Sequence, residues 1–397
     1  MGAERQAAWP QSLLLLFGSC LPVLGAVLIA PVLPRLQAHF EAVPGASVLV
    51  PVALTLPALV IALLAPLAGM LADRVGRKPL LLVSMLLYTL CGTLPLWLES
   101  LPLIVLSRAG IGVAEAGIMT CCTTLMGDYY EGERRERLFA LQMVATSLSA
   151  AVFMGVGGAL GGTGWRIPFS LYAVGLLCLP LMARLLWEPA QVQRAVRRAP
   201  AFPWRRLLGL YLLTALAGIS LFIVPVQAGY LLALQQIDDP RLIGLSMGAN
   251  QLGVLAGALG FRLLARWPVS RLLALGFAVA GVGGGAMALA SGIGAMSAAV
   301  LLNGAGIGLL LPSLITKVMA QVTFEQRGRA TGGFTAAIFA GEFVSPLVVL
   351  ALTQGQVPAL PRALLLIACA QCAIAVLCLL RWKHAEKEGG AALNPKG

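Results

Sequence analysis

Long apolar segments recur along the whole chain and constrain its fold more than any other feature. A helix that crosses the ~30 Å hydrocarbon core of a bilayer needs about 20 mostly apolar residues. Segments of this kind lie at 11–34, 48–71, 79–98, 102–129, 138–161, 166–187, 207–233, 242–262, 271–291, 295–319, 330–352 and 361–381. Only 11% of the residues are charged, whereas a soluble domain carries about a quarter. The sequence therefore predicts an all-α membrane protein with twelve transmembrane helices.

Basic residues indicate how these helices are oriented. If the N-terminus is cytoplasmic, all but five of the 28 Lys and Arg residues fall on the cytoplasmic side. The five exceptions are Arg35, Arg108, Arg166, Arg241 and Arg362. Because Lys and Arg concentrate in cytoplasmic loops, we expect both termini to be cytoplasmic. The net charge of +12 then reflects membrane topology, and we expect no nucleic-acid partner.

The chain also divides into two related halves. An E-x-R-x-R pattern occurs at 133–137, after the fourth segment, and again at 325–329, after the tenth. Gly-Ile-Gly likewise occurs at 110–112 and at 306–308. Such repeats are typical of secondary transporters, whose substrate site lies near the midplane between them. We expect a six-helix half at 1–187, a basic cytoplasmic linker at 188–206, a second six-helix half at 207–381 and a cytoplasmic tail at 382–397.

A charged motif follows the second segment. Residues 69–78 read Gly-Met-Leu-Ala-Asp-Arg-Val-Gly-Arg-Lys, which resembles the G-x-L-a-D-R-x-G-R-K signature of the major facilitator superfamily. The resemblance implies two six-helix bundles and a cytoplasmic charge cluster that latches them together in the outward-open state. Its residues here would be Gly69, Asp73, Arg74, Gly76, Arg77, Lys78 and, at the end of the fourth segment, Asp128.

Three further stretches resemble the twelve-helix drug:proton antiporters of this superfamily. The first segment carries Leu24-Gly25 followed by Pro31 and Pro34, similar to an L-G-…-P-x-x-P ending. Residues 108–112 resemble the R-x-x-x-G element associated with proton coupling. Residues 157–162 resemble G-P-x-x-G-G, with Gly158 in place of the proline. This resemblance implies efflux driven by protons.

Three ionisable residues lie deep within predicted helices, where charge is costly and tends to be functional. Glu115 follows Arg108 by seven residues, so both lie on nearly the same helix face. Glu342 lies near the middle of the eleventh segment. Our hypothesis is that Glu115 and Glu342 carry protons or hold a cationic substrate, with Arg108 tuning the proton affinity of Glu115. The alternative is that Glu115 is paired permanently with Arg108, or either acid with a polar neighbour, for packing.

We therefore expect a secondary active transporter that exports small lipophilic or cationic compounds in exchange for protons. The alternative is a proton-linked importer of a sugar or organic acid; a non-transporting membrane sensor or lipid enzyme ranks below both. The sequence contains no H-E-x-x-H or Walker motif, and we expect no enzyme activity. We also expect no catalytic residue, metal or cofactor, the proton gradient as the energy source, and a monomer in a bacterial inner membrane.

Overall fold

The computed structural model describes residues 8–189, 202–264, 266–323 and 326–392, and within these ranges the regular structure is entirely helical. Twelve helical stretches are long and apolar enough to cross a membrane, which confirms the prediction. The α-helices are α1 (Trp9–Val27), α2 (Leu33–His39), α3 (Ala46–Val75), α4 (Arg77–Thr93), α5 (Leu101–Tyr129), α6 (Gly132–Gly161), α7 (Val174–Leu185), α8 (Trp204–Ala233), α9 (Pro240–Leu263), α10 (Val269–Leu289), α11 (Gly292–Met319), α12 (Arg327–Thr353) and α13 (Leu360–Ala392). Short 3-10 turns are η1 (Ala30–Val32), η2 (Leu94–Leu96), η3 (Ile167–Ala173) and η5 (Val357–Ala359).

The first predicted segment is interrupted. The helix α1 ends at Val27, and the chain passes through η1 before α2 begins. Pro31 and Pro34 cause this break, because a proline ring lacks an N–H and clashes with the preceding turn of a helix. The sixth segment is also composite, since the 3-10 helix η3 precedes α7.

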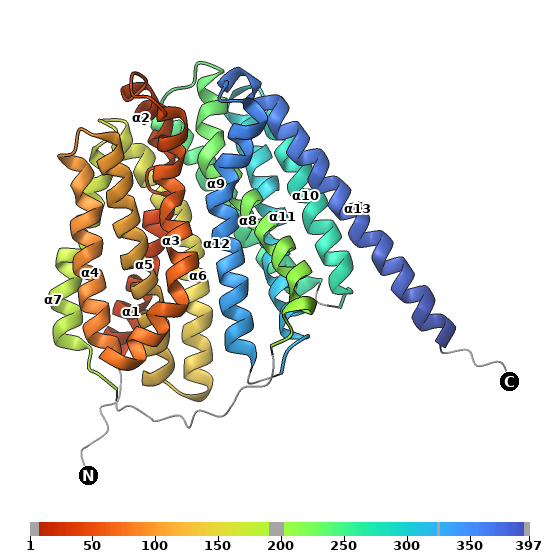
Figure 1. Cartoon of the computed structure of the whole chain (residues 1–397), viewed down its shortest axis with the longest axis horizontal. Coiled ribbons are helices and arrows are strands. Elements are labelled where there is room, and N and C mark those ends of the chain that lie inside the picture. Colours follow the sequence, from red (N-terminus) through yellow and green to blue (C-terminus); the bar gives the residue numbers. More distant parts are fainter. Residues whose placement is uncertain (1–7, 190–201, 265, 324–325, 393–397) are drawn as a thin grey trace, which may run out of the picture.

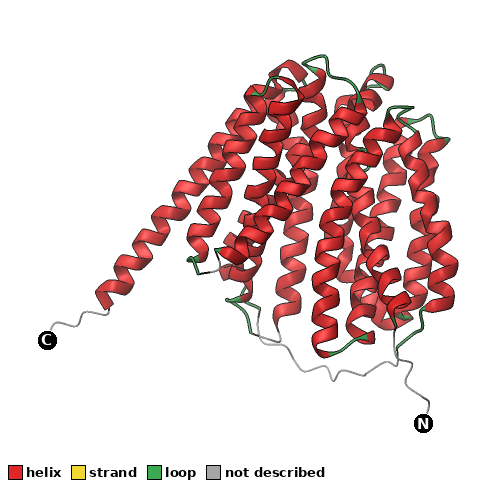
Figure 2. Ribbon diagram, turned by 180° about the vertical axis from the view of Figure 1, so that it is seen from behind, coloured by secondary structure: helices red, strands yellow, loops and turns green. Residues whose placement is uncertain are grey.

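The helix α1 begins and α13 ends at the same end of the bundle, which we call the terminal end (Figure 1). The short helix α2 lies at the opposite end, which we call the far end. The view from behind shows the same bundle, with helices running between these two ends and loops joining them (Figure 2).

Two groups of helices make up the bundle. In one group α5 packs against α1, α3 and α4, and in the other α11 packs against α9 and α10, and α8 against α12. The groups meet where α6 contacts α9 and where α3 contacts α12. The crossing of α6 and α9 is close at the far end, because a Cβ added to Gly158 would overlap the carbonyl oxygen of Pro240 and crowd the Cα of Gly244.

The predicted boundaries between halves fall partly outside the described residues. Residues 190–201 of the expected linker 188–206 are among those not described, so the division into 1–187 and 207–381 stays a prediction. The last helix continues beyond the expected end at 381, as far as Ala392. Helix-forming Ala, Glu and Lys residues follow that point without a proline before 395.

Candidate functional site

Arg108 lies on α5 and is completely buried. Its guanidinium donates hydrogen bonds to the Ala53 carbonyl of α3 at 3.1 Å, to the Tyr172 hydroxyl of η3 at 2.6 Å, and to the Gly25 carbonyl of α1. The ring of Tyr172 also faces the guanidinium carbon, 5.5 Å from the ring centroid. Arg108 thus fastens three segments to α5, and within the described part of the chain it makes no ion pair.

Glu115 lies two turns further along α5 and is 1% exposed. Neither of its carboxylate oxygens has a hydrogen-bond partner among the described residues. The permanent pair with Arg108 that we weighed as the alternative is therefore not made, because the guanidinium is occupied by carbonyls and a hydroxyl. The carboxyl of Glu115 nevertheless lies within electrostatic range of Arg108.

The space for the Glu115 carboxyl comes from Gly25. A Cβ added to Gly25 would overlap Oε1 of Glu115. The carbonyl of the same glycine accepts the hydrogen bond from Arg108. One residue of α1 therefore contacts both buried ionisable groups of α5. The sequence marked Gly25 only as part of a family resemblance, and nothing in its spacing indicated this contact.

Glu342 lies on α12, in the other helix group, and is 5% exposed. The residues beside it hold α12 against α8: a Cβ on Gly341 would overlap the Ala215 carbonyl, and Ser345 donates to the Ile219 carbonyl at 2.9 Å. Glu342 itself makes no hydrogen bond or ion pair with the residues described. Glu342 lies within electrostatic range of Glu115, although the two acids belong to different helix groups.

The charged motif after α3 forms a compact cluster at the terminal end. Arg77 contacts Asp128 of α5 at 2.8 Å and Asp73 of α3 at 3.5 Å. Gly76, which joins α3 to α4, has a φ of +103°, a conformation that favours glycine. Lys78 donates to the carbonyl of Ala183 in α7 at 2.8 Å. The structure thus brings together Asp73, Arg77 and Asp128, whereas Arg74 is exposed and makes no contact of this kind in the described chain.

Glu188 completes this cluster, and sequence reasoning did not find it. Its carboxylate accepts hydrogen bonds from the backbone N–H groups of Arg77 and Lys78, at 2.8 and 2.7 Å. These N–H groups open α4 and have no partner within the helix, so an acceptor with negative charge stabilises them. Local sequence gives no signal for this contact, because Glu188 lies more than a hundred residues away from its partners.

Gly69 of the charged motif does not lie at a close contact between helices. A Cβ added there would meet no described atom within 4 Å. The far end is packed instead: besides the α6–α9 crossing, a Cβ on Gly229 of α8 would lie 3.1 Å from the ring of Pro34 in α2. In this conformation the two helix groups therefore touch closely at the far end, and Gly69 near the terminal end faces open space.

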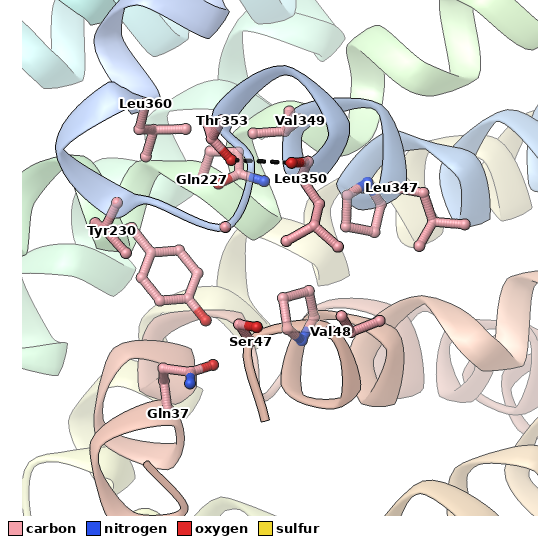
Figure 3. Close-up of a pocket in the computed structure, with 14 residues that line it drawn as sticks. Gln37, Ser47, Val48, Gln227, Tyr230, Leu347, Val349, Leu350, Thr353 and Leu360 are labelled. Atoms are coloured by element: carbon pink, nitrogen blue, oxygen red, sulfur yellow. Dashed lines mark hydrogen bonds between the residues drawn. The ribbon is translucent and has the colours of Figure 1, made fainter. Parts of the chain in front are cut away.

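A cavity of about 160 Å³ lies at the far end, between α3 and α12 (Figure 3). Its walls come from α2 and α3 in one helix group and from α8, α12, η5 and the start of α13 in the other. Gln227 and Tyr230 of α8 line it, whereas neither Glu115 nor Glu342 does.

Twelve membrane-length helices in two groups, with one buried acid in each group, define an integral multi-pass membrane protein built like a transporter. The chain belongs to the Major Facilitator Superfamily, whose family model matches residues 15–261. Members of this family transport small molecules, in agreement with the class expected from the sequence.

Two relatives and one solved structure illustrate the similarity. The chain is 30% identical over 356 residues to the class C tetracycline resistance protein of Escherichia coli, covering 84% of this chain and 87% of the relative. It is 28% identical to the class H tetracycline resistance protein of Pasteurella multocida over 46% of each chain. The crystal structure of a D-xylose-proton symporter superposes with a TM-score of 0.75 at 14% identity, over 93% of this chain and 97% of that one. This structural likeness concerns the fold.

Proposed function

We propose that the protein is a proton-coupled exporter of small lipophilic or cationic compounds that works by alternating access. In this proposal it is a monomer in a bacterial inner membrane, with both termini in the cytoplasm and the proton gradient as its energy source. The observation that carries the proposal is a pair of buried acids, Glu115 and Glu342, one from each helix group. The oxygens of Glu115 have no hydrogen-bond partner among the described residues.

The energetic argument starts from the cost of burying charge. An ionised carboxylate without hydrogen bonds is costly to bury, and protonation or a bound cation removes that cost. If a proton and a cationic substrate cannot occupy the same carboxyl at once, binding of one releases the other. Because Glu115 and Glu342 interact electrostatically, a proton or cation on one acid changes what the other can bind.

The surroundings of Glu115 fit this role. Arg108, Tyr88 and Tyr172 lie within electrostatic range of its carboxylate. Tyr88 donates to the Leu21 carbonyl at 2.8 Å, and Tyr172 accepts from Arg108. These three partners are fixed by their own bonds, whereas the carboxyl is free to gain or lose a ligand. The direction of transport in the proposal is supported by the similarity to proteins named for tetracycline resistance.

The cluster of Asp73, Arg77, Asp128 and Glu188 would act as the cytoplasmic gate. It holds the ends of α3, α4, α5 and α7 together, so these helices would move as one body when the groups rock. Open space beside Gly69 leaves room for the other helix group to approach when the far end opens.

Everted membrane vesicles test the proposal. We expect them to accumulate the fluorescent cation ethidium on energisation, and an uncoupler to abolish the accumulation. Glu115→Gln and Glu342→Gln should each remove the dependence of transport on pH, whereas Glu133→Gln, at an exposed surface pair, should keep it. If transport remained pH-dependent in both the Glu115→Gln and the Glu342→Gln variants, the proposed role of the acids would be refuted. Proton-linked uptake of a sugar or organic acid by intact cells would favour import.

A further inference from the structure

The cavity at the far end contains a polar group without a partner among the described residues. The hydroxyl of Tyr230 is buried and makes no hydrogen bond with any described residue, while the tyrosine as a whole is 9% exposed. Gln227, one turn earlier on α8, is 6% exposed. In Figure 3 the ring of Tyr230 lies between the two walls, with its hydroxyl directed toward the α3 side. Because buried polar groups are normally satisfied, the Tyr230 hydroxyl indicates a missing ligand.

The remaining surface of the cavity is largely apolar. Val48 of α3 lies on one side, and Leu347 and Leu350 of α12 lie on the other (Figure 3). Tyr230 is the only ionisable residue among those described as lining it. A charged ligand would lose its hydration here without gaining a counter-charge, which is costly. An uncharged molecule with one hydroxyl or carbonyl would suit both the apolar walls and the unpartnered hydroxyl.

We propose that this cavity is a second ligand site, which takes a small, uncharged, mostly apolar molecule carrying a hydroxyl or carbonyl group and holds the far end closed. The closing effect rests on the proposed alternating access. Since α3 and α12 belong to different helix groups, opening of the far end separates the two walls and destroys the site.

A ligand that binds only one conformation shifts the equilibrium toward it in proportion to 1 + [L]/Kd. At a ligand concentration of ten times Kd, the ratio of closed to open far ends would rise about 11-fold. Ligand in this cavity therefore slows transport without competing for the buried acids.

Binding of radiolabelled 2-naphthol to the purified full chain in lipid nanodiscs tests the site. We expect saturable binding above that of empty nanodiscs. Tyr230→Phe should weaken it roughly three- to tenfold, since one hydrogen bond is lost. Val48→Trp should abolish it by filling the cavity, whereas Val376→Trp, at a residue of α13 that is 54% exposed and does not line the cavity, should leave it unchanged. An unchanged elution profile in size-exclusion chromatography selects the variants that fold.

A transport assay is the second part of the experiment. Saturating 2-naphthol should slow ethidium uptake by wild-type vesicles several-fold and leave the Val48→Trp variant unaffected. Binding needs no transport, so a wrong proposed function would leave the binding results intact. Equal binding to the wild type and to Val48→Trp, or none above empty nanodiscs, would overturn the site. Binding without slower transport in a wild type that does transport ethidium would overturn the closing effect.

Discussion

Arg108 and Glu115 lie two turns apart on one helix and are both buried, but only Arg108 has hydrogen-bond partners. Arg108 donates to three acceptors on three other segments, whereas the oxygens of Glu115 have no partner in the described chain. A buried charge with all its hydrogen bonds made adds to structural specificity. A buried acid without hydrogen bonds costs free energy, which a bound proton or cation can offset. At the residue scale, Arg108 is therefore held by the fold, and Glu115 is the group that we propose for exchange.

Removing one acceptor from Arg108 should be costly. Tyr172→Phe leaves a buried guanidinium N–H without a partner, which we expect to lower the free energy of unfolding by about 1–3 kcal/mol. Tyr230→Phe is the matched control, because its hydroxyl has no partner to lose, and we expect a change of about 0.5 kcal/mol or less. Titration of the purified protein with SDS measures both. Equal effects of the two substitutions would contradict the role given to Tyr172.

At the scale of single elements, close crossings and helix ends decide how α4, α6 and α9 are placed. The crossing of α6 and α9 depends on Gly158, at the position where the resembling antiporters have a proline. A Cβ there would overlap the Pro240 carbonyl, so the glycine allows the two backbones to touch. The start of α4 depends instead on a carboxylate supplied from the end of α7.

Gly158→Ala should separate α6 from α9. We expect it to lower the free energy of unfolding by about 1–3 kcal/mol, as overpacking does. Gly155→Ala, one turn earlier on the same helix, places its Cβ where no described atom lies within 4 Å. It should be neutral or stabilise by up to about 1 kcal/mol, because alanine favours helix. The same SDS titration compares them, and a similar loss in both would show that the crossing is not tight.

Glu188→Ala should weaken the start of α4. Loss of an anionic acceptor at a helix N-terminus costs about 1–2 kcal/mol. Glu133→Ala, which removes an exposed pair with Arg137 at 2.7 Å, should cost only about 0.3–0.5 kcal/mol. Addition of salt should reduce the effect at Glu188, since the carboxylate is exposed. A loss at Glu188 no larger than that at Glu133 would exclude a capping role.

Features that could be predicted depend on residues close together in the sequence, whereas those that could not depend on contacts between residues far apart in the sequence. Apolar length gave the twelve spans, and the two prolines explain the break after α1, because both depend on nearby residues. The contact of Glu188 with α4 and of Gly25 with Glu115 could not be found in this way. Each joins segments distant in sequence, and each depends on the angle at which two helices cross, which hydropathy does not specify.

At the scale of the whole molecule, the helix groups are joined at the far end. There α6 packs on α9 and α2 on α8, and the cavity between α3 and α12 is bounded by both groups. The proposed gate cluster and both ends of the helical chain lie at the terminal end. The distribution of basic residues predicts that the terminal end faces the cytoplasm, and this orientation can be measured directly.

Fusions of reporter proteins test this orientation. Green fluorescent protein attached after Gly397 should fluoresce, because it folds in the cytoplasm. Alkaline phosphatase inserted within residues 41–45, between α2 and α3, should be active, because it needs the oxidising periplasm. The opposite pair of results would invert the topology and place the Arg77 cluster on the outer surface.

The contact between Gly25 and Glu115 also limits how this protein and its relatives can diverge. A side chain at position 25 and a glutamate at position 115 compete for the same volume, so no side chain can be added at position 25 while the glutamate stays. A lineage that loses the acid can accept alanine or serine in α1, and one that keeps the acid cannot. In a large alignment of relatives we therefore expect these two columns to vary together, although 90 positions of sequence separate them.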